Sequence, residues 1–210
     1  AEPMKAPQPI DRFEIRLSGL GGQGLITLGR LLGSALALGH GYYVTQTQSY
    51  GPEARGGSSR ADVVVSSRPI SYPKTENLDL LVALSPEACN SYYRLLKKTG
   101  ILLVDTTLVK HAPTNVYLGL PFTQMAKEQI GNPMTINTMV MGAVTHLLPF
   151  ADPKVMRKSL EANLPAKIRE VNAKAFALGL KQAQRNFGDA GGIWAAAEEN
   201  GQHAEDDIIV

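Results

Sequence analysis

Residues 13–32 read FEIRLSGLGGQGLITLGRLL, and this stretch decides the fold. Its first six residues alternate apolar and polar side chains, as in a strand, and leucines recur at helical spacing after residue 24. The glycine run at 19–24 therefore lies in a turn between a strand and a helix. Such a turn exposes backbone N–H groups at the positive end of the helix, where a phosphate group can bind. We expect a phosphorylated ligand at this turn.

The rest of the chain predicts an α/β fold. We expect strands at 42–47, 61–66, 69–72, 79–85, 101–104 and 116–120, with 61–66 and 69–72 forming a pair, and a helix at 86–98. After Pro121 we expect only helices, at 122–130, 134–148, 154–162 and 166–187. Strands that alternate with helices indicate a Rossmann-like, doubly wound, mostly parallel sheet with a helical C-terminal part.

The length of 210 residues fits one main domain, and a content of 44% hydrophobic and 19% charged residues is typical of globular proteins. Residues 1–11 are rich in proline and predict a flexible N-terminal arm. Residues 12–187 predict a single α/β domain, helical from about 122. Residues 188–210 predict a Gly-rich and acidic C-terminal tail.

Charge and composition argue against several classes of function. A net charge of +2 does not favour nucleic acid or a membrane surface as a partner. The sequence shows neither a signal-peptide pattern nor an apolar run near the ~20 residues that a spanning helix needs, so we expect a cytoplasmic protein. The single cysteine, Cys89, excludes an internal disulfide and a cluster held by this chain alone, and we expect it to be buried on a helix. The four histidines are far apart, so we expect no metal site.

The glycine run alone does not establish a dehydrogenase. A dinucleotide-binding fold normally carries Asp or Glu about 20 residues beyond the glycines, but Thr45, Gln46, Thr47 and Gln48 stand there. The glycine-rich loop that follows contains Arg55 and Arg60, which could grip a phosphate or carboxylate. The alternative to a ligand-binding role is a structured turn in which Glu53 and Arg55 pair with other groups. We find no nucleophile arrangement, and we expect Asp105 to cap the turn that follows it and His146 to be a satisfied interior side chain.

Two motifs in this order resemble the gamma subunit of 2-oxoacid:ferredoxin oxidoreductases. The first is the run at 19–24 with Thr27 and Gly29, and the second is SYGPEARGG at 49–57. The similarity continues at 63–66, 69–70, 79–84 and 137–142, and covers roughly residues 12–180. The second motif looks more like that of the 2-oxoglutarate-type enzymes than that of the pyruvate-type enzymes.

The resemblance implies a subunit of a complex that oxidatively decarboxylates a 2-oxoacid to an acyl-CoA and reduces ferredoxin. In this family thiamine diphosphate with Mg²⁺ lies between alpha and beta subunits, and a ferredoxin-like delta subunit carries [4Fe–4S] clusters. The gamma subunit helps to form the coenzyme A site and the subunit interface, without being catalytic alone. The residues that the resemblance assigns to this site are Gly19, Gly21, Gly22, Gln23, Gly24, Thr27, Ser49, Tyr50, Gly51, Glu53, Arg55, Gly56 and Gly57.

Two alternatives remain open at this point. The chain could be a purely structural assembly subunit of that complex, whose glycine-rich loop only packs against a partner. It could also be a stand-alone NADP-binding reductase, with Arg55 or Arg60 at the 2′-phosphate.

Overall fold

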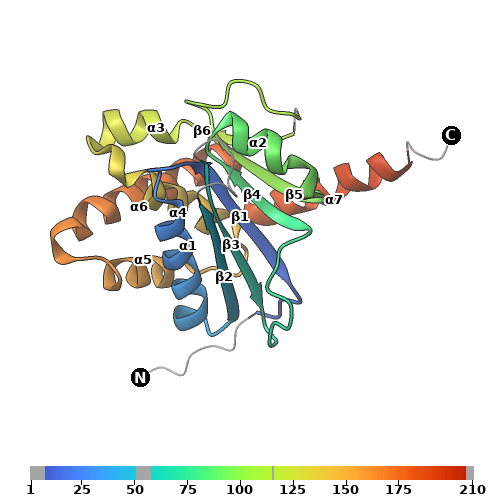
Figure 1. The fold of residues 1–210 in the computed structure, drawn as a ribbon, viewed down its shortest axis with the longest axis horizontal. Coiled ribbons are helices and arrows are strands. Elements are labelled where there is room, and N and C mark those ends of the chain that lie inside the picture. The colour runs from blue at the N-terminus through green and yellow to red at the C-terminus, as the bar shows by residue number, and fades with distance from the viewer. Residues whose placement is uncertain (1–7, 51–57, 115, 207–210) are drawn as a thin grey trace.

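The computed structural model describes residues 8–50, 58–114 and 116–206, and these contain one six-stranded sheet in the order β2-β3-β1-β4-β5-β6 (Figure 1). The strands are β1 Phe13–Leu20, β2 Tyr43–Tyr50, β3 Ser58–Ser66, β4 Leu78–Ala83, β5 Leu96–Asp105 and β6 Leu118–Leu120. Only β3 runs against the others, because it pairs antiparallel with both β1 and β2 while the β1–β4, β4–β5 and β5–β6 pairs are parallel. The predicted mostly parallel α/β fold is confirmed.

In the same described residues, seven α-helices connect and cover these strands. They are α1 Leu25–Ser34, α2 Pro86–Tyr92, α3 Phe122–Met125, α4 Ile136–Leu147, α5 Pro153–Ala162, α6 Ala166–Phe187 and α7 Ala190–Asp206. A π-helical turn extends α1 over Ala35–Gly39, another extends α3 over Ala126–Ile130, and 3₁₀ turns at Tyr93–Leu95 and Pro133–Thr135 follow α2 and precede α4. The helices predicted after Pro121 are present.

The first two helices cover opposite faces of the sheet. Leu80 and Val82 of β4 belong to the main core with α1, whereas Leu81 and Ala83 of the same strand pack with Ala88 of α2. Because successive side chains of a strand point to opposite faces, α1 and α2 must lie on different sides. The sheet is therefore doubly wound, and its connections diverge between β1 and β4.

One predicted strand is wrong. Residues 69–72 form no strand, because β3 already has β1 on one side and β2 on the other. Side chains just before and at the start of β1 instead hold this segment and the residues that follow it. Arg12 donates to the Tyr72 carbonyl at 2.6 Å, and Glu14 accepts the Asn77 N–H at 2.8 Å.

Two other segments differ from the sequence prediction. The helix predicted at 86–98 ends at Tyr92, since Leu96 pairs with Leu78 and begins β5. Residues 190–206, within the segment described above as a Gly-rich and acidic tail, form α7. Figure 1 shows this helix beside β5 and extending past the sheet, and Trp194 on it donates its Nε1–H to the Leu147 carbonyl at 2.7 Å.

The helical part rests on α4, which is buried on nearly every side between the sheet and α6. The two helices approach at their glycines. A Cβ on Gly142 would overlap the Phe176 carbonyl, and a Cβ on Gly179 would overlap the Met139 carbonyl. This close backbone contact fixes α4 relative to α6 and to the sheet.

A buried ion pair lies on the face of the sheet that α2 covers. Arg16 donates from Nε and Nη2 to the two carboxylate oxygens of Asp62 at 2.8 and 3.0 Å, and the two side chains are only 4% and 6% exposed. Thr75, from the segment after β3, donates to the same carboxylate at 2.9 Å. The pair joins β1, β3 and this segment.

We predict that Asp62→Ala lowers the free energy of unfolding by about 3–5 kcal/mol, because it leaves the Arg16 charge buried and uncompensated. Asp11→Ala is the control. It removes the exposed Asp11–Arg68 pair, whose side chains are 88% and 76% exposed, and should cost no more than about 1 kcal/mol. Urea unfolding of the full chain measures both. Equal losses in the two variants would contradict the structural role of the buried pair.

Candidate functional site

The candidate site lies where the carboxyl ends of β1 and β4 meet. Ser18 of β1 donates its hydroxyl to the Val82 carbonyl at 2.9 Å, and the Leu84 N–H donates to the Ser18 carbonyl at 2.9 Å. Beyond this point the chain turns toward α1 on one face and toward α2 on the other. Doubly wound sheets bind ligands in the crevice outside the strand ends at such a point.

The glycine run forms the turn between β1 and α1, as the sequence predicted. Gly22 and Gly24 have φ values of 87° and 75°, in the left-handed region that favours glycine. Gly24 is the N-cap of α1, where it has no side chain to cap the helix, and the first turn of α1 holds no acidic residue. The first N–H groups of α1 are thus left for an outside acceptor, and an anion suits them best.

The side chain of Gln23 forms hydrogen bonds that hold the turn together. Its Oε1 accepts the Leu20 N–H at 2.7 Å, and its Nε2 donates to the Leu84 carbonyl at 3.4 Å. A Cβ on Gly19 would overlap this Oε1 and would lie 3.0 Å from the Leu84 Cβ. Gln23 therefore ties β1 to the end of β4, and Gly19 must be glycine for the tie to fit.

Part of the second motif reaches the same end of the sheet. Ser49 and Tyr50 are the last residues of β2, and Ser49 is buried opposite Arg60 of β3, which in turn lies opposite Ser18. Thr27 lies half-buried in the first turn of α1. The other predicted residues of this motif, Gly51, Glu53, Arg55, Gly56 and Gly57, lie outside the described residues.

Arg60 brings a positive charge to this edge of the sheet. Its guanidinium carbon lies 5.7 Å from the centre of the Tyr92 ring, and that of Arg16 lies 4.6 Å from the same ring. Cation–π contacts of this kind orient guanidinium groups. Tyr92, at the end of α2, is a neighbour that sequence reasoning did not find.

Asn137, at the start of α4, is the second residue that sequence reasoning missed as a site residue. Its Nδ2 donates to the Gly24 carbonyl at 3.4 Å, across 113 positions of sequence. A polar residue at the start of an apolar helix was the available signal, but the contact depends on how α4 packs beside α1.

Two predictions about single side chains are confirmed, and a third is confirmed in part. Cys89 is fully buried on α2, and burial raises the pKa of its thiol to about 11. Asp105 accepts the Thr107 N–H at 3.0 Å, which caps the turn after β5, and it also accepts the Thr123 hydroxyl at 2.5 Å. His146 has the expected hydrogen-bond partner, since its Nε2 lies 2.6 Å from the Gly188 carbonyl oxygen, but it is half-buried and not an interior side chain.

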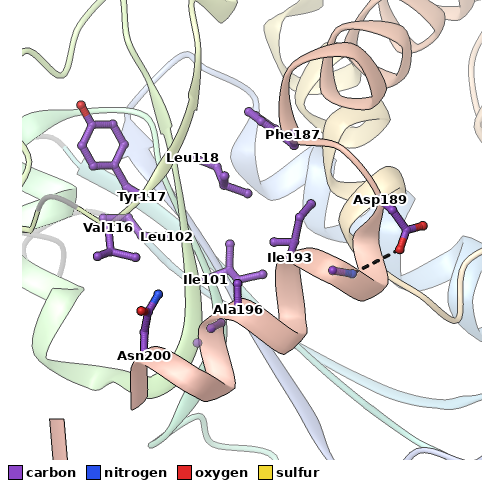
Figure 2. A pocket seen from close by; sticks show the side chains of 13 residues that line it. Ile101, Leu102, Val116, Tyr117, Leu118, Phe187, Asp189, Ile193, Ala196 and Asn200 are labelled. Carbon is purple, nitrogen blue, oxygen red and sulfur yellow. Dashed lines mark hydrogen bonds between the residues drawn. The ribbon is translucent and has the colours of Figure 1, made fainter. Parts of the chain in front are cut away.

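A separate apolar groove of about 400 Å³ lies between α7 and the strands β5 and β6 (Figure 2). Ile101, Leu118 and Ile193 line it, and Asp189, just before α7, accepts the Gly192 N–H from the first turn of that helix at 3.2 Å. The groove lies over the Gly100–Leu102 part of β5, away from the glycine turn. Its apolar lining does not suit a phosphate group, so the crevice between β1 and β4 is the better phosphate site.

Within the described ranges, no group of three or more His, Cys, Asp or Glu side chains is placed to hold a metal ion. No helix in the same ranges combines the length and the apolar character needed to cross a bilayer.

Comparison with known proteins identifies the family. The family described as pyruvate ferredoxin/flavodoxin oxidoreductase matches residues 14–182, which include the sheet, the glycine turn and the helices through most of α6. The chain belongs to this family. The resemblance predicted from the two glycine-rich motifs is thereby confirmed, and the family is one of oxidoreductases.

Individual members of the pyruvate ferredoxin/flavodoxin oxidoreductase family are similar to the chain over most of its length. It is 42% identical over 177 residues to the 2-oxoglutarate synthase subunit KorC of Methanocaldococcus jannaschii, with 82% of this chain and 95% of that protein covered. The gamma subunit of a keto/oxoacid ferredoxin oxidoreductase from Geobacter sulfurreducens has a similar structure, with a TM-score of 0.77 and 35% identity over 84% of this chain and 98% of that one. Both of these proteins are subunits of larger enzymes.

A third protein shares the fold. The 2-oxoglutarate:ferredoxin oxidoreductase of Magnetococcus marinus, solved with 2-oxoglutarate, coenzyme A and succinyl-CoA bound, matches with a TM-score of 0.73 and 22% identity. The match covers 84% of this chain but 32% of that one, so the same domain is part of a longer polypeptide there.

We predict that Cys89 reacts with iodoacetamide at pH 8 at least about 100-fold more slowly in the native chain than in denatured chain, because the thiolate is the reactive form and is depleted by the raised pKa. Mass spectrometry of timed samples measures the rate. Fast labelling of the native chain would show that the thiol is accessible, contrary to its burial.

Proposed function

We propose that this chain is the gamma-type subunit of a cytoplasmic 2-oxoacid:ferredoxin oxidoreductase, with 2-oxoglutarate as the favoured substrate. The complex would convert the 2-oxoacid and coenzyme A to an acyl-CoA and reduce ferredoxin. The similarity to the KorC subunit, at 42% identity over nearly all of that protein, supports this choice of substrate.

The proposed role of the chain is to bind a phosphate group of coenzyme A at the turn between β1 and α1. The observation that carries this role is the left-handed Gly22 and Gly24, which leave the first N–H groups of α1 open to an anion at the strand crevice. Each hydrogen bond to a charged phosphate contributes about 1.5–3 kcal/mol. Arg60, and Arg55 on the evidence of the sequence motif, would supply balancing positive charge.

The same end of the molecule would form the contact with the thiamine-binding alpha and beta subunits. Leu20, beside the glycines, is 39% exposed, and Met134, just before α4, is 75% exposed. The centre of a subunit interface is apolar, so exposed apolar side chains at this end of the molecule suit such a contact. These side chains also support the alternative of a purely structural assembly subunit.

Thiamine diphosphate, Mg²⁺ and the [4Fe–4S] clusters would be held by partner chains, among them the ferredoxin-like delta subunit. The single cysteine of this chain is fully buried on α2 and cannot ligate a cluster that needs four thiolates. The residues of this chain therefore do not fit a cluster. Their proposed work is to bind and orient coenzyme A.

A stand-alone NADP-binding reductase finds less support. The similar proteins that cover most of the chain are subunits of 2-oxoacid oxidoreductases and not stand-alone reductases. Titration of the purified chain with NADPH distinguishes this alternative, since saturable binding would favour it.

We predict that Thr27→Glu raises the KM for coenzyme A tenfold or more in the assembled complex. A carboxylate in the first turn of α1 favours the helix, so the variant should fold, but it repels a phosphate at the same N–H groups. Thr27→Gln is the matched neutral control and should change KM less than about threefold, since it adds no charge that Coulomb repulsion could act on. Steady-state kinetics measures KM, and a sizing column verifies assembly.

The outcome separates the two roles. If Thr27→Glu assembles normally and keeps the coenzyme A dependence of the unmodified complex, the phosphate role is wrong. If Thr27→Glu prevents assembly while Thr27→Gln does not, the turn contacts a partner subunit and the assembly role is favoured.

A further inference from the structure

Asn137 fills the space beside the N-cap of α1. A Cβ on Gly24 would lie 2.6 Å from Asn137 Nδ2, so the side-chain amide occupies the place that a side chain at position 24 would need. Asn137 is only 9% exposed. A buried amide this close to the candidate phosphate site must either support the fold or shape the site.

Both the oxygen and the nitrogen of the Asn137 side-chain amide form hydrogen bonds. Its Oδ1 accepts the Thr138 N–H at 2.9 Å, and its Nδ2 donates to the Gly24 carbonyl at 3.4 Å. The same carbonyl accepts the Leu28 N–H at 2.9 Å, the first hydrogen bond of α1. The Gly24 carbonyl thus has two donors, one from its own helix and one from α4.

The packing of α4 against α6 fixes the position of Asn137. The next residue, Thr138, donates its hydroxyl to Asn172 Oδ1 of α6 at 2.8 Å, and Asn172 Nδ2 donates to the Ile168 carbonyl at 2.8 Å. The close contacts at Gly142 and Gly179 fix α4 against α6. Side chains held by packing and second hydrogen bonds keep a site in one geometry.

The peptide plane connects this carbonyl to the site. The Gly24 carbonyl and the Leu25 N–H belong to one planar trans peptide, in which they point in opposite directions. A hydrogen bond that fixes the carbonyl therefore also fixes the direction of the Leu25 N–H, the first N–H group of α1.

We propose that Asn137 is a positioning residue for the phosphate site. Its amide holds the Gly24–Leu25 peptide so that the Leu25 N–H points out of the turn toward the phosphate. The inference rests on the proposed function, because it assigns a residue to that same site. It adds α4 to the elements that build the site, although α4 follows the glycine turn by more than a hundred residues.

The experiment compares Asn137→Ala with Asn172→Ala in the assembled complex. Asn172 is 7% exposed and belongs to the same buried network, but it bonds to Thr138 and Ile168 instead of the turn. Both variants should lower the Tm by similar amounts. Only Asn137→Ala should raise the KM for coenzyme A, by about threefold to tenfold as expected for one lost neutral hydrogen bond, with kcat unchanged.

Asn137→Asp is a second variant of nearly the same shape. Its carboxylate cannot donate to the Gly24 carbonyl and repels both that oxygen and a phosphate, so its KM for coenzyme A should exceed that of Asn137→Ala. If Asn137→Ala fails to assemble, the KM of Asn137→Asp still tests the role of Asn137.

Three results would overturn the inference. In the first, Asn172→Ala raises KM as much as Asn137→Ala, which makes the effect one of general stability. In the second, both Asn137 variants keep the normal KM while Thr27→Glu raises it, which leaves the proposed function intact without Asn137. In the third, neither the two Asn137 variants nor Thr27→Glu changes the KM for coenzyme A, and the phosphate site itself is then wrong.

Discussion

The turn between β1 and α1 depends on the absence of side chains at a few positions. At Gly19 the space for a Cβ is taken by the Gln23 amide, and at Gly24 it is taken by Asn137. Gly22 and Gly24 also need left-handed backbone, which costs other residues free energy. The rest of the site follows, because only this tight turn brings the start of α1 to the crevice between β1 and β4.

Local patterns were sufficient to predict most of the helices and the central strands. Pro86 begins α2 after the Ser85 N-cap, whose hydroxyl accepts the Ala88 N–H, and Pro153 begins α5 after the Asp152 N-cap. Such caps act within a few residues and can be read directly. The end of α2 could not be predicted in this way, because it depends on the pairing of β5 with β4. The loop at 69–72 could not either, because β3 is already paired with β1 and β2.

The candidate site also has a part that could be predicted from the sequence and a part that could not. The glycine turn could be predicted because its residues are consecutive and their conformations are intrinsic to glycine. The contacts of Asn137 and Tyr92 could not, since each joins segments that are far apart in the chain. Arg16 is a further case. Its place in an alternating strand suggests a solvent-facing side chain, but the segment after β3 covers it and the buried Asp62 balances its charge.

The helix α7 extends the family domain. The family match ends at residue 182, whereas α7 spans Ala190–Asp206 and packs beside β5. It lies away from the glycine turn, so the proposed phosphate site is built from elements of the family domain alone.

The most direct test is the structure of the assembled complex with coenzyme A bound, determined by cryo-electron microscopy. A phosphate oxygen of coenzyme A should lie within about 3 Å of a backbone nitrogen among Leu25, Ile26 and Thr27, the normal length of such a hydrogen bond. A partner subunit packed directly onto the glycine turn, with coenzyme A bound elsewhere, would contradict the phosphate role and leave the chain with assembly alone.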